Sequence, residues 1–119
     1  MAQGIRTING YTNNYPTVSS SAASWAIGTA VWNTTYVHTG DGTVTSISVT
    51  IPAYAVADGS REIRICFKAG TGCTFTPTTS NFTTTYGTGD ISITAGNTYE
   101  ISFVPLSASI LSVVCKEWS

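Results

Sequence analysis

The chain has 119 residues, of which 42% are hydrophobic and only 9% are charged, and its formal net charge is −1. This length suits one domain with one hydrophobic core, and the charged fraction is far below the roughly 25% that is typical of soluble domains. The five cationic residues form no run, so the composition argues against a nucleic-acid partner.

The first 22 residues are polar and rich in turn formers, including Asn9-Gly10 and Tyr15-Pro16. Such a segment offers little to a packed core, and an isolated arm frays unless a neighbouring molecule holds it. We therefore expect residues 1–22 to form an extended N-terminal arm, with Tyr11 and Tyr15 as candidate contacts. The chain begins without a basic and apolar leader and has no apolar run of membrane-spanning length, which predicts cytoplasmic synthesis and no membrane partner.

From residue 23 onward, short apolar segments alternate with turn signals about every ten residues, a pattern typical of a β-sandwich or barrel. Within Thr43–Ile51, apolar side chains occupy one face and hydroxyl side chains the other, which predicts a half-buried strand. The preceding Gly40-Asp41-Gly42 is suited to a tight hairpin with the segment Ala30–Val37. We expect residues 23–119 to form a single β domain.

Later segments continue this pattern. Glu62–Lys68 and Thr98–Val104 alternate apolar with polar residues, and we expect a further strand at Asp90–Thr94. Ser109–Trp118 is apolar on both faces, as in strands that are covered on both sides. Because a two-layer domain has one interior, we expect a second subunit to cover the other face of this strand. The candidate interface residues are Leu111, Val113, Val114 and Trp118.

No group of residues predicts catalysis or metal binding. The single histidine, His38, lies beside a turn, and the chain has no Gly-x-Ser-x-Gly motif for a nucleophile. The carboxylates flank turn glycines or fall on polar strand positions. The three thiols, Cys66, Cys73 and Cys115, lack the close Cys-x2-Cys pairs of zinc sites, and their odd number favours reduced cysteines. We expect a non-enzymatic protein with no cofactor and no metal.

The C-terminal half carries a resemblance to a known group of proteins. Arg61–Gly70 is followed by a Thr/Pro-rich loop, by Ile93–Phe103 and by a last apolar strand that ends in Trp118. This order resembles β domains at the ends of tailed-bacteriophage virion proteins, which include tail-fibre, head-fibre and capsid-decoration components. The turn–strand unit Ala95–Ile101 matches most closely. The resemblance implies an antiparallel jelly-roll-like or immunoglobulin-like sandwich, commonly a homotrimer displayed on a virion.

Two functions are therefore expected. In the first, the chain is a structural protein of a bacteriophage virion that is synthesised in the host bacterial cytoplasm and contacts capsid or tail proteins. In the second, it is a receptor- or glycan-binding module that recognises the bacterial surface. Binding residues concentrate on loops held by a rigid scaffold. The candidate recognition loop carries the aromatic residues Phe75, Phe82 and Tyr86.

Overall fold

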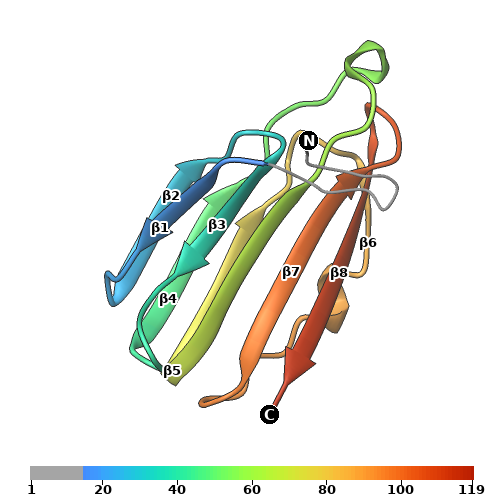
Figure 1. The fold of residues 1–119 in the computed structure, drawn as a ribbon. Helices are drawn as coiled ribbons and strands as arrows, with labels where there is room; N and C mark the ends of the chain where they lie inside the picture. The colour runs from blue at the N-terminus through green and yellow to red at the C-terminus, as the bar shows by residue number, and fades with distance from the viewer. Residues whose placement is uncertain (1–14) are drawn as a thin grey trace, which may run out of the picture.

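The computed structural model describes residues 15–119, which form eight strands, two short 3-10 turns and no α-helix (Figure 1). The all-β class expected from the sequence is confirmed for this range. The strands are β1 (Thr17–Ser20), β2 (Ser24–Thr29), β3 (Thr34–His38), β4 (Val44–Thr50), β5 (Ile63–Thr78), β6 (Thr84–Tyr86), β7 (Thr98–Pro105) and β8 (Ile110–Trp118). The 3-10 turns are Val56–Asp58 and Thr88–Asp90.

The N-terminal half of the described chain winds through two stacked layers (Figure 1). In the front layer, β1, β3 and residues 63–68 of β5 lie side by side and parallel. In the back layer, β2, β4 and residues 74–78 of β5 are arranged in the same way. The chain thus passes three times from the front layer to the back layer. These passes stack on one another as coils, which is a solenoid-like arrangement.

The C-terminal half extends the front layer. β7 is antiparallel to β5, β8 is antiparallel to β7, and the short β6 runs parallel to β8 at the edge. Among residues 15–119, five of the seven strand pairings are parallel. This mixed sheet differs from the antiparallel jelly-roll-like or immunoglobulin-like sandwich that we expected. Alternating residues indicate the two faces of a strand but say nothing of which strand lies beside it.

Two local predictions are also wrong. The Gly40–Gly42 turn joins β3 to β4, but these strands lie in different layers and do not pair with each other, so the turn closes no hairpin. Asp90–Thr94 is not a strand, because Asp90 ends a 3-10 turn and the following residues are irregular. The side chains of Ile91 and Ile93 instead pack, partly buried, against the core.

Part of the segment that we expected to form an N-terminal arm lies in the sheet. Thr17–Ser20 forms β1, whose residues pair in register with β3, from Thr17 opposite Thr35 to Ser20 opposite His38. The arm boundary expected at residue 22 therefore falls inside the sheet. Tyr15 is half-buried just before β1, and Tyr11 lies outside the described residues.

The core is a set of rows that run across neighbouring strands. In the front layer Tyr36, Ile65 and Ile101 occupy one row and are all buried. The layers meet through aromatic side chains, because the Phe67 ring stacks on Tyr99 at 5.4 Å and on Phe75 at 5.8 Å between ring centroids. Such contacts fix both the burial and the relative position of the two layers.

Candidate binding face

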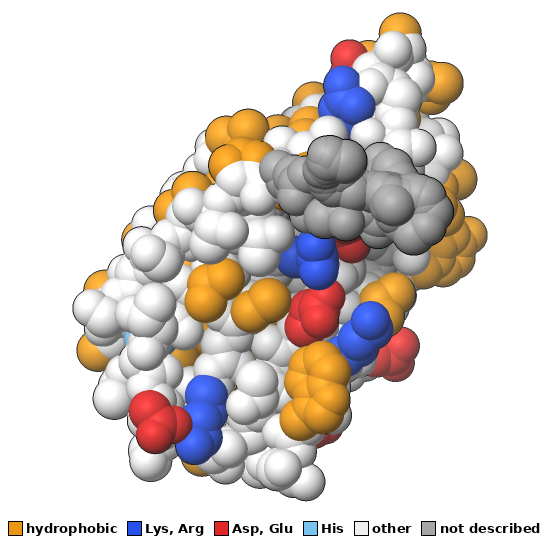
Figure 2. Space-filling model, in the orientation of Figure 1, with side chains coloured by type: hydrophobic (Ala, Val, Ile, Leu, Met, Phe, Trp, Pro, Cys, Tyr) orange, Lys and Arg blue, Asp and Glu red, His pale blue; other side chains and the backbone are white. Residues whose placement is uncertain are grey.

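The outer surfaces of the two layers differ in chemistry. The back layer presents three outward rows of small, mostly hydroxyl-bearing side chains and no charged residue on its strands. These rows are Ser24–Ser46–Thr74, Ala26–Ser48–Thr76 and Thr29–Thr50–Thr78. Ser24 and Ser46 are joined by a hydroxyl hydrogen bond of 2.9 Å. The front layer instead carries acidic and basic side chains interspersed with hydrophobic ones (Figure 2).

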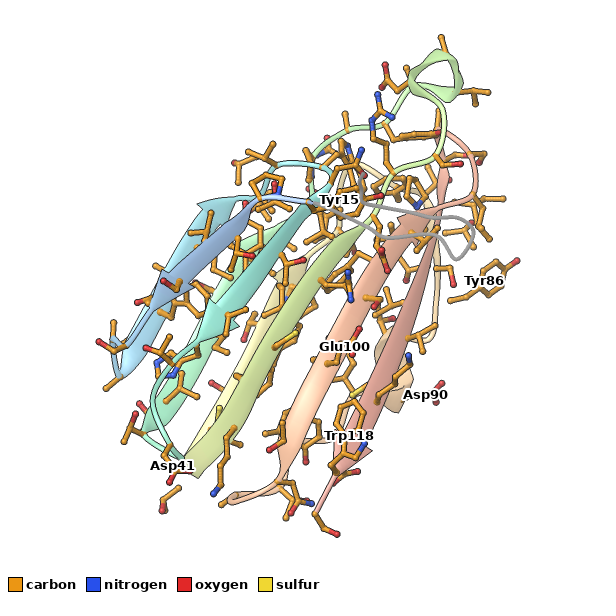
Figure 3. The ribbon with its side chains drawn as sticks, in the orientation of Figure 1. Tyr15, Asp41, Tyr86, Asp90, Glu100 and Trp118 are labelled. Atoms are coloured by element: carbon orange, nitrogen blue, oxygen red, sulfur yellow. The ribbon has the colours of Figure 1, made fainter. Side chains whose placement is uncertain are left out.

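The charged side chains of the front layer lie in register across β5, β7 and β8. Three outward rows cross these strands: Arg64–Ser102–Val114, Cys66–Glu100–Lys116 and Lys68–Thr98–Trp118. Figure 3 shows Glu100 on β7, Trp118 on β8 and Asp41 in the turn between β3 and β4. We call this surface the front face. It brings together residues that are far apart in the sequence.

Ion pairs neutralise most of the charge on the front face. Arg64 lies between two carboxylates, with its Nη1 3.5 Å from Glu100 Oε2 and its Nε 3.8 Å from Glu62 Oε1. Lys68 Nζ donates a 2.7 Å hydrogen bond to Asp41 Oδ1. This hydrogen bond and the positive charge of Lys68 lower the pKa of the Asp41 carboxyl from its ordinary value of 3.8.

The surroundings of the three thiols in the described chain disfavour the thiolate form. Burial raises the pKa of Cys66, and the nearby Glu100 carboxylate raises it further, while Arg64 opposes the shift. Burial likewise raises the pKa values of Cys73 and Cys115. A raised pKa reduces the thiolate fraction at neutral pH, and the thiolate is the reactive and metal-binding form. Among residues 15–119, no three His, Cys, Asp or Glu side chains lie close enough together to hold a metal ion.

His38 supports the turn at the end of β3. Its Nε2–H donates to the Ala22 carbonyl oxygen at 2.7 Å, and its Nδ1 accepts from the Gly40 N–H at 3.1 Å. The ring is buried against Trp25, with 5.8 Å between the ring centroids. Both nitrogens are therefore engaged with the backbone, which is a structural role.

A shallow, open hollow of about 350 Å³ lies on the front face, over the end of β3 and residues 66–68 of β5. The apolar groups of Val37 and Cys66 line it together with the Asp41–Lys68 ion pair. Thr98 lines the opposite side of the hollow and lies directly across the sheet from Trp118 on β8. The indole of Trp118 is 52% exposed.

The predicted interface residues of β8 separate into two sets. Leu111 and Val113 point into the domain's own core, with exposures of 0% and 4%, so their assignment to a subunit interface is wrong. Val114 and Trp118 lie on the outer face and are about half exposed. Both faces of β8 carry apolar residues, so the sequence could not show which face points into the core.

The predicted recognition loop does not form an exposed aromatic cluster. Phe82 is buried, and its ring makes an edge contact with Trp32. Phe75 is half-buried and stacks between Phe67 and Phe103. Only Tyr86 of the three is exposed, at 58%, and it lies at the edge of the sheet (Figure 3). Phe75 and Phe82 therefore contribute to the packing of the domain instead of forming an exposed aromatic surface with Tyr86.

Local sequence patterns do not identify the residues that line the hollow. Asp41 has the pattern of a turn former, and Lys68 falls on a polar position of an alternating strand. Their proximity depends on the stacking of the 39–43 turn against the middle of β5, which no local pattern indicates. The outward position of Lys68 in an alternating strand was the one signal available.

Comparison with known proteins found no family model, no curated protein and no solved structure that matches this chain. In the described part of the chain, no helix is long and apolar enough to cross a membrane.

Proposed function

We propose that this chain is a non-enzymatic structural protein of a bacteriophage virion, a capsid-decoration, head-fibre or tail-fibre component. Its partners are other copies of itself and neighbouring capsid or tail proteins. The resemblance of the C-terminal half, from Arg61 to Trp118, to virion β domains supports this assignment. Stacked coils also suit a structural role, because each coil is held by its neighbours and the whole forms a stiff unit.

The observation that carries the proposal is an apolar patch on the outer face of β6 and β8. Val114 is 50% exposed and Tyr86 is 58% exposed, although the core beneath them is closed. Both side chains lie on the same face, since Tyr86 pairs with Ser112 and Val114 follows two residues later. Together with the partly buried Ile110, they form what we call the assembly patch. Aromatic and aliphatic groups of this kind, beside charged residues, are typical of subunit interfaces.

Light scattering tests whether the assembly patch joins subunits. We expect the wild-type chain to form a homotrimer at micromolar concentration, because the resembling virion domains are commonly threefold. Val114→Asp places a charge in the contact and dissociates the trimer. Val56→Asp is the matched control, since Val56 is 67% exposed in the loop between β4 and β5. A monomeric wild type, or equal effects of the two substitutions, would contradict assembly through this patch.

A second experiment tests whether the protein is a component of the virion. Mass spectrometry of particles purified from the bacterial host after phage production should detect the chain at many copies per particle. Its presence only in the soluble fraction of the lysate would contradict the proposal. Particles assembled with the Val114→Asp chain should contain less of it than particles assembled with the Val56→Asp chain.

A further inference from the structure

Trp118 differs from the other two tryptophans. Trp25 is buried and contacts Tyr36, while Trp32 donates its indole N–H to the Ala53 carbonyl oxygen at 2.9 Å. Within residues 15–119, the Trp118 ring stacks on no other aromatic ring and its Nε1 has no hydrogen-bond partner. A large, half-exposed aromatic ring with no structural contact of this kind is available to a ligand.

The hollow supplies polar groups in the same row of the sheet as Trp118, and its lining extends as far as Thr98, the residue opposite Trp118. Lys68 Nζ uses one of its three N–H donors on Asp41 Oδ1, which leaves two donors. Asp41 retains a second carboxylate oxygen, and the exposed Thr98 hydroxyl can both donate and accept. These groups form a short array of donors and acceptors that ends at Thr98, the residue directly opposite Trp118.

The spacing suits a ligand of one or two sugar rings. Lys68, Thr98 and Trp118 occupy one row on three adjacent strands. Neighbouring strands lie about 5 Å apart, so the row spans about 10 Å. A pyranose ring has an apolar C–H face that packs on an indole, and a rim of hydroxyls that hydrogen-bond to carboxylate, ammonium and hydroxyl groups.

Charge and shape narrow the class of ligand. Asp41 and Lys68 neutralise each other within the hollow, and the next row along the sheet adds Glu100 and Lys116, again one of each sign. Such a site has no net charge with which to attract an anion. It is also open, whereas sites for isolated small molecules enclose most of the ligand surface. An exposed glycan chain needs no such enclosure.

We infer that the hollow and the adjoining Trp118 ring together bind a neutral oligosaccharide, with the Trp118 indole against the C–H face of one sugar ring and Asp41, Lys68 and Thr98 hydrogen-bonded to hydroxyls of the next ring. This function is independent of the location of the protein in a virion. The site is also separate from the assembly patch, because Trp118 lies four residues, or about 13 Å, along β8 from Val114. A shallow site gives weak binding per subunit, and several copies in one assembly would raise the avidity.

The test is an NMR titration of the full-length ¹⁵N-labelled protein with neutral disaccharides built from glucose, galactose, mannose or N-acetylglucosamine. At least one of them is expected to shift the Trp118 indole N–H resonance saturably, together with the Lys68 and Thr98 amides, with a Kd on the order of 1 mM. Trp118→Ala weakens this binding at least tenfold and Asp41→Asn weakens it severalfold. Val56→Ala is the control, because Val56 is 67% exposed in the loop between β4 and β5 and belongs neither to the hollow nor to the assembly patch. It leaves the affinity unchanged.

Several results would overturn the inference. These are the absence of a saturable shift with every sugar, binding by Trp118→Ala at the wild-type affinity, and tighter binding of sialic-acid or uronic-acid sugars than of neutral ones. The Val114→Asp chain separates this inference from the proposed function. Each subunit of this variant is expected to bind sugar with the wild-type affinity, whatever its oligomeric state. Loss of binding would contradict the separation of the sugar site from the assembly patch.

Discussion

Gly70 in β5 lies directly against the backbone of Val44 at the start of β4. A Cβ atom at position 70 would be 2.6 Å from the Val44 carbonyl oxygen and 2.9 Å from the Gly42 carbonyl oxygen. The turn between β3 and β4 in the second coil and the bend of β5 in the third coil therefore stack through backbone atoms, with no room for a side chain. This contact is a direct consequence of the parallel coil arrangement.

Gly70→Ala tests that arrangement. The new methyl group meets rigid backbone rather than a flexible side chain, so we expect a loss of about 1–3 kcal/mol in the free energy of unfolding. Urea denaturation followed by fluorescence measures it. Gly89→Ala is the matched control, because a Cβ at position 89 meets no atom within 4 Å, and it changes stability by less than about 0.5 kcal/mol. Equal effects of the two substitutions would contradict the stacking of the turns.

The sequence predicted the strands better than their neighbours. Alternation located β4, the first half of β5 and β7, because each buries one face against the core, and a run that is apolar on both faces located β8. It could not show that β4 lies parallel to β2, because the pattern of buried and exposed residues in a strand is the same whether its neighbour is parallel or antiparallel. Nor could it show that residues 74–78 continue β5 in a different layer. The solenoid-like winding depends on contacts between residues more than 20 positions apart, such as Ser24 with Ser46.

The candidate site was predictable only in part. The sequence indicated that β8 has a second apolar face, and Val114 and Trp118 are indeed exposed there. The hollow beside Trp118 was not predictable, because the Asp41–Lys68 hydrogen bond joins residues 27 positions apart. Each of the two had a sufficient local explanation, as a turn former and as a surface charge. Only the three-dimensional structure brings them to the same side of the sheet.

The Asp41–Lys68 hydrogen bond predicts a pH dependence. Because the folded-state pKa of Asp41 is lowered from 3.8, its contribution to stability is fully present above that ordinary value and is lost as the pH falls through the folded-state pKa. Carboxyl ¹³C NMR titration is expected to give Asp41 a midpoint below 3.8. Lys68→Met removes both causes and returns the midpoint towards 3.8. A midpoint that is the same with and without Lys68 would show that the two side chains do not interact in solution.

Thiol reactivity tests the electrostatics of the front face. The Glu100 carboxylate contributes to the raised pKa of Cys66, and the Glu117 carboxylate contributes to the raised pKa of Cys115. Glu100→Gln therefore lowers the Cys66 pKa and speeds its alkylation by iodoacetamide at pH 8, because the thiolate fraction rises. Glu117→Gln does the same for Cys115 and leaves Cys66 unchanged. Peptide mass spectrometry reports both sites in one reaction, and acceleration of the same cysteine in both variants would argue against these pairings.

Val113 and Val114 are a matched pair of residues that tests which face of β8 points into the core. They are adjacent residues of the same type, but Val113 is 4% exposed and Val114 is 50% exposed. Val113→Ala removes two buried carbon atoms and leaves a cavity, so we expect a loss of about 2 kcal/mol at any protein concentration. Val114→Ala leaves the fold of the single chain intact and costs less than about 0.5 kcal/mol under dilute, monomeric conditions.

The dependence on concentration then links β8 to assembly. If Val114 contacts a second copy, folding and association are coupled, and the cost of Val114→Ala grows as the protein concentration is raised into the range where the trimer forms. Thermal unfolding at two concentrations at least a hundredfold apart measures this difference. If Val114→Ala and Val113→Ala lower the free energy of unfolding equally in dilute solution, the face of β8 that points into the core is misassigned. A cost at Val114 that stays small at both concentrations would place the subunit contact elsewhere on the molecule.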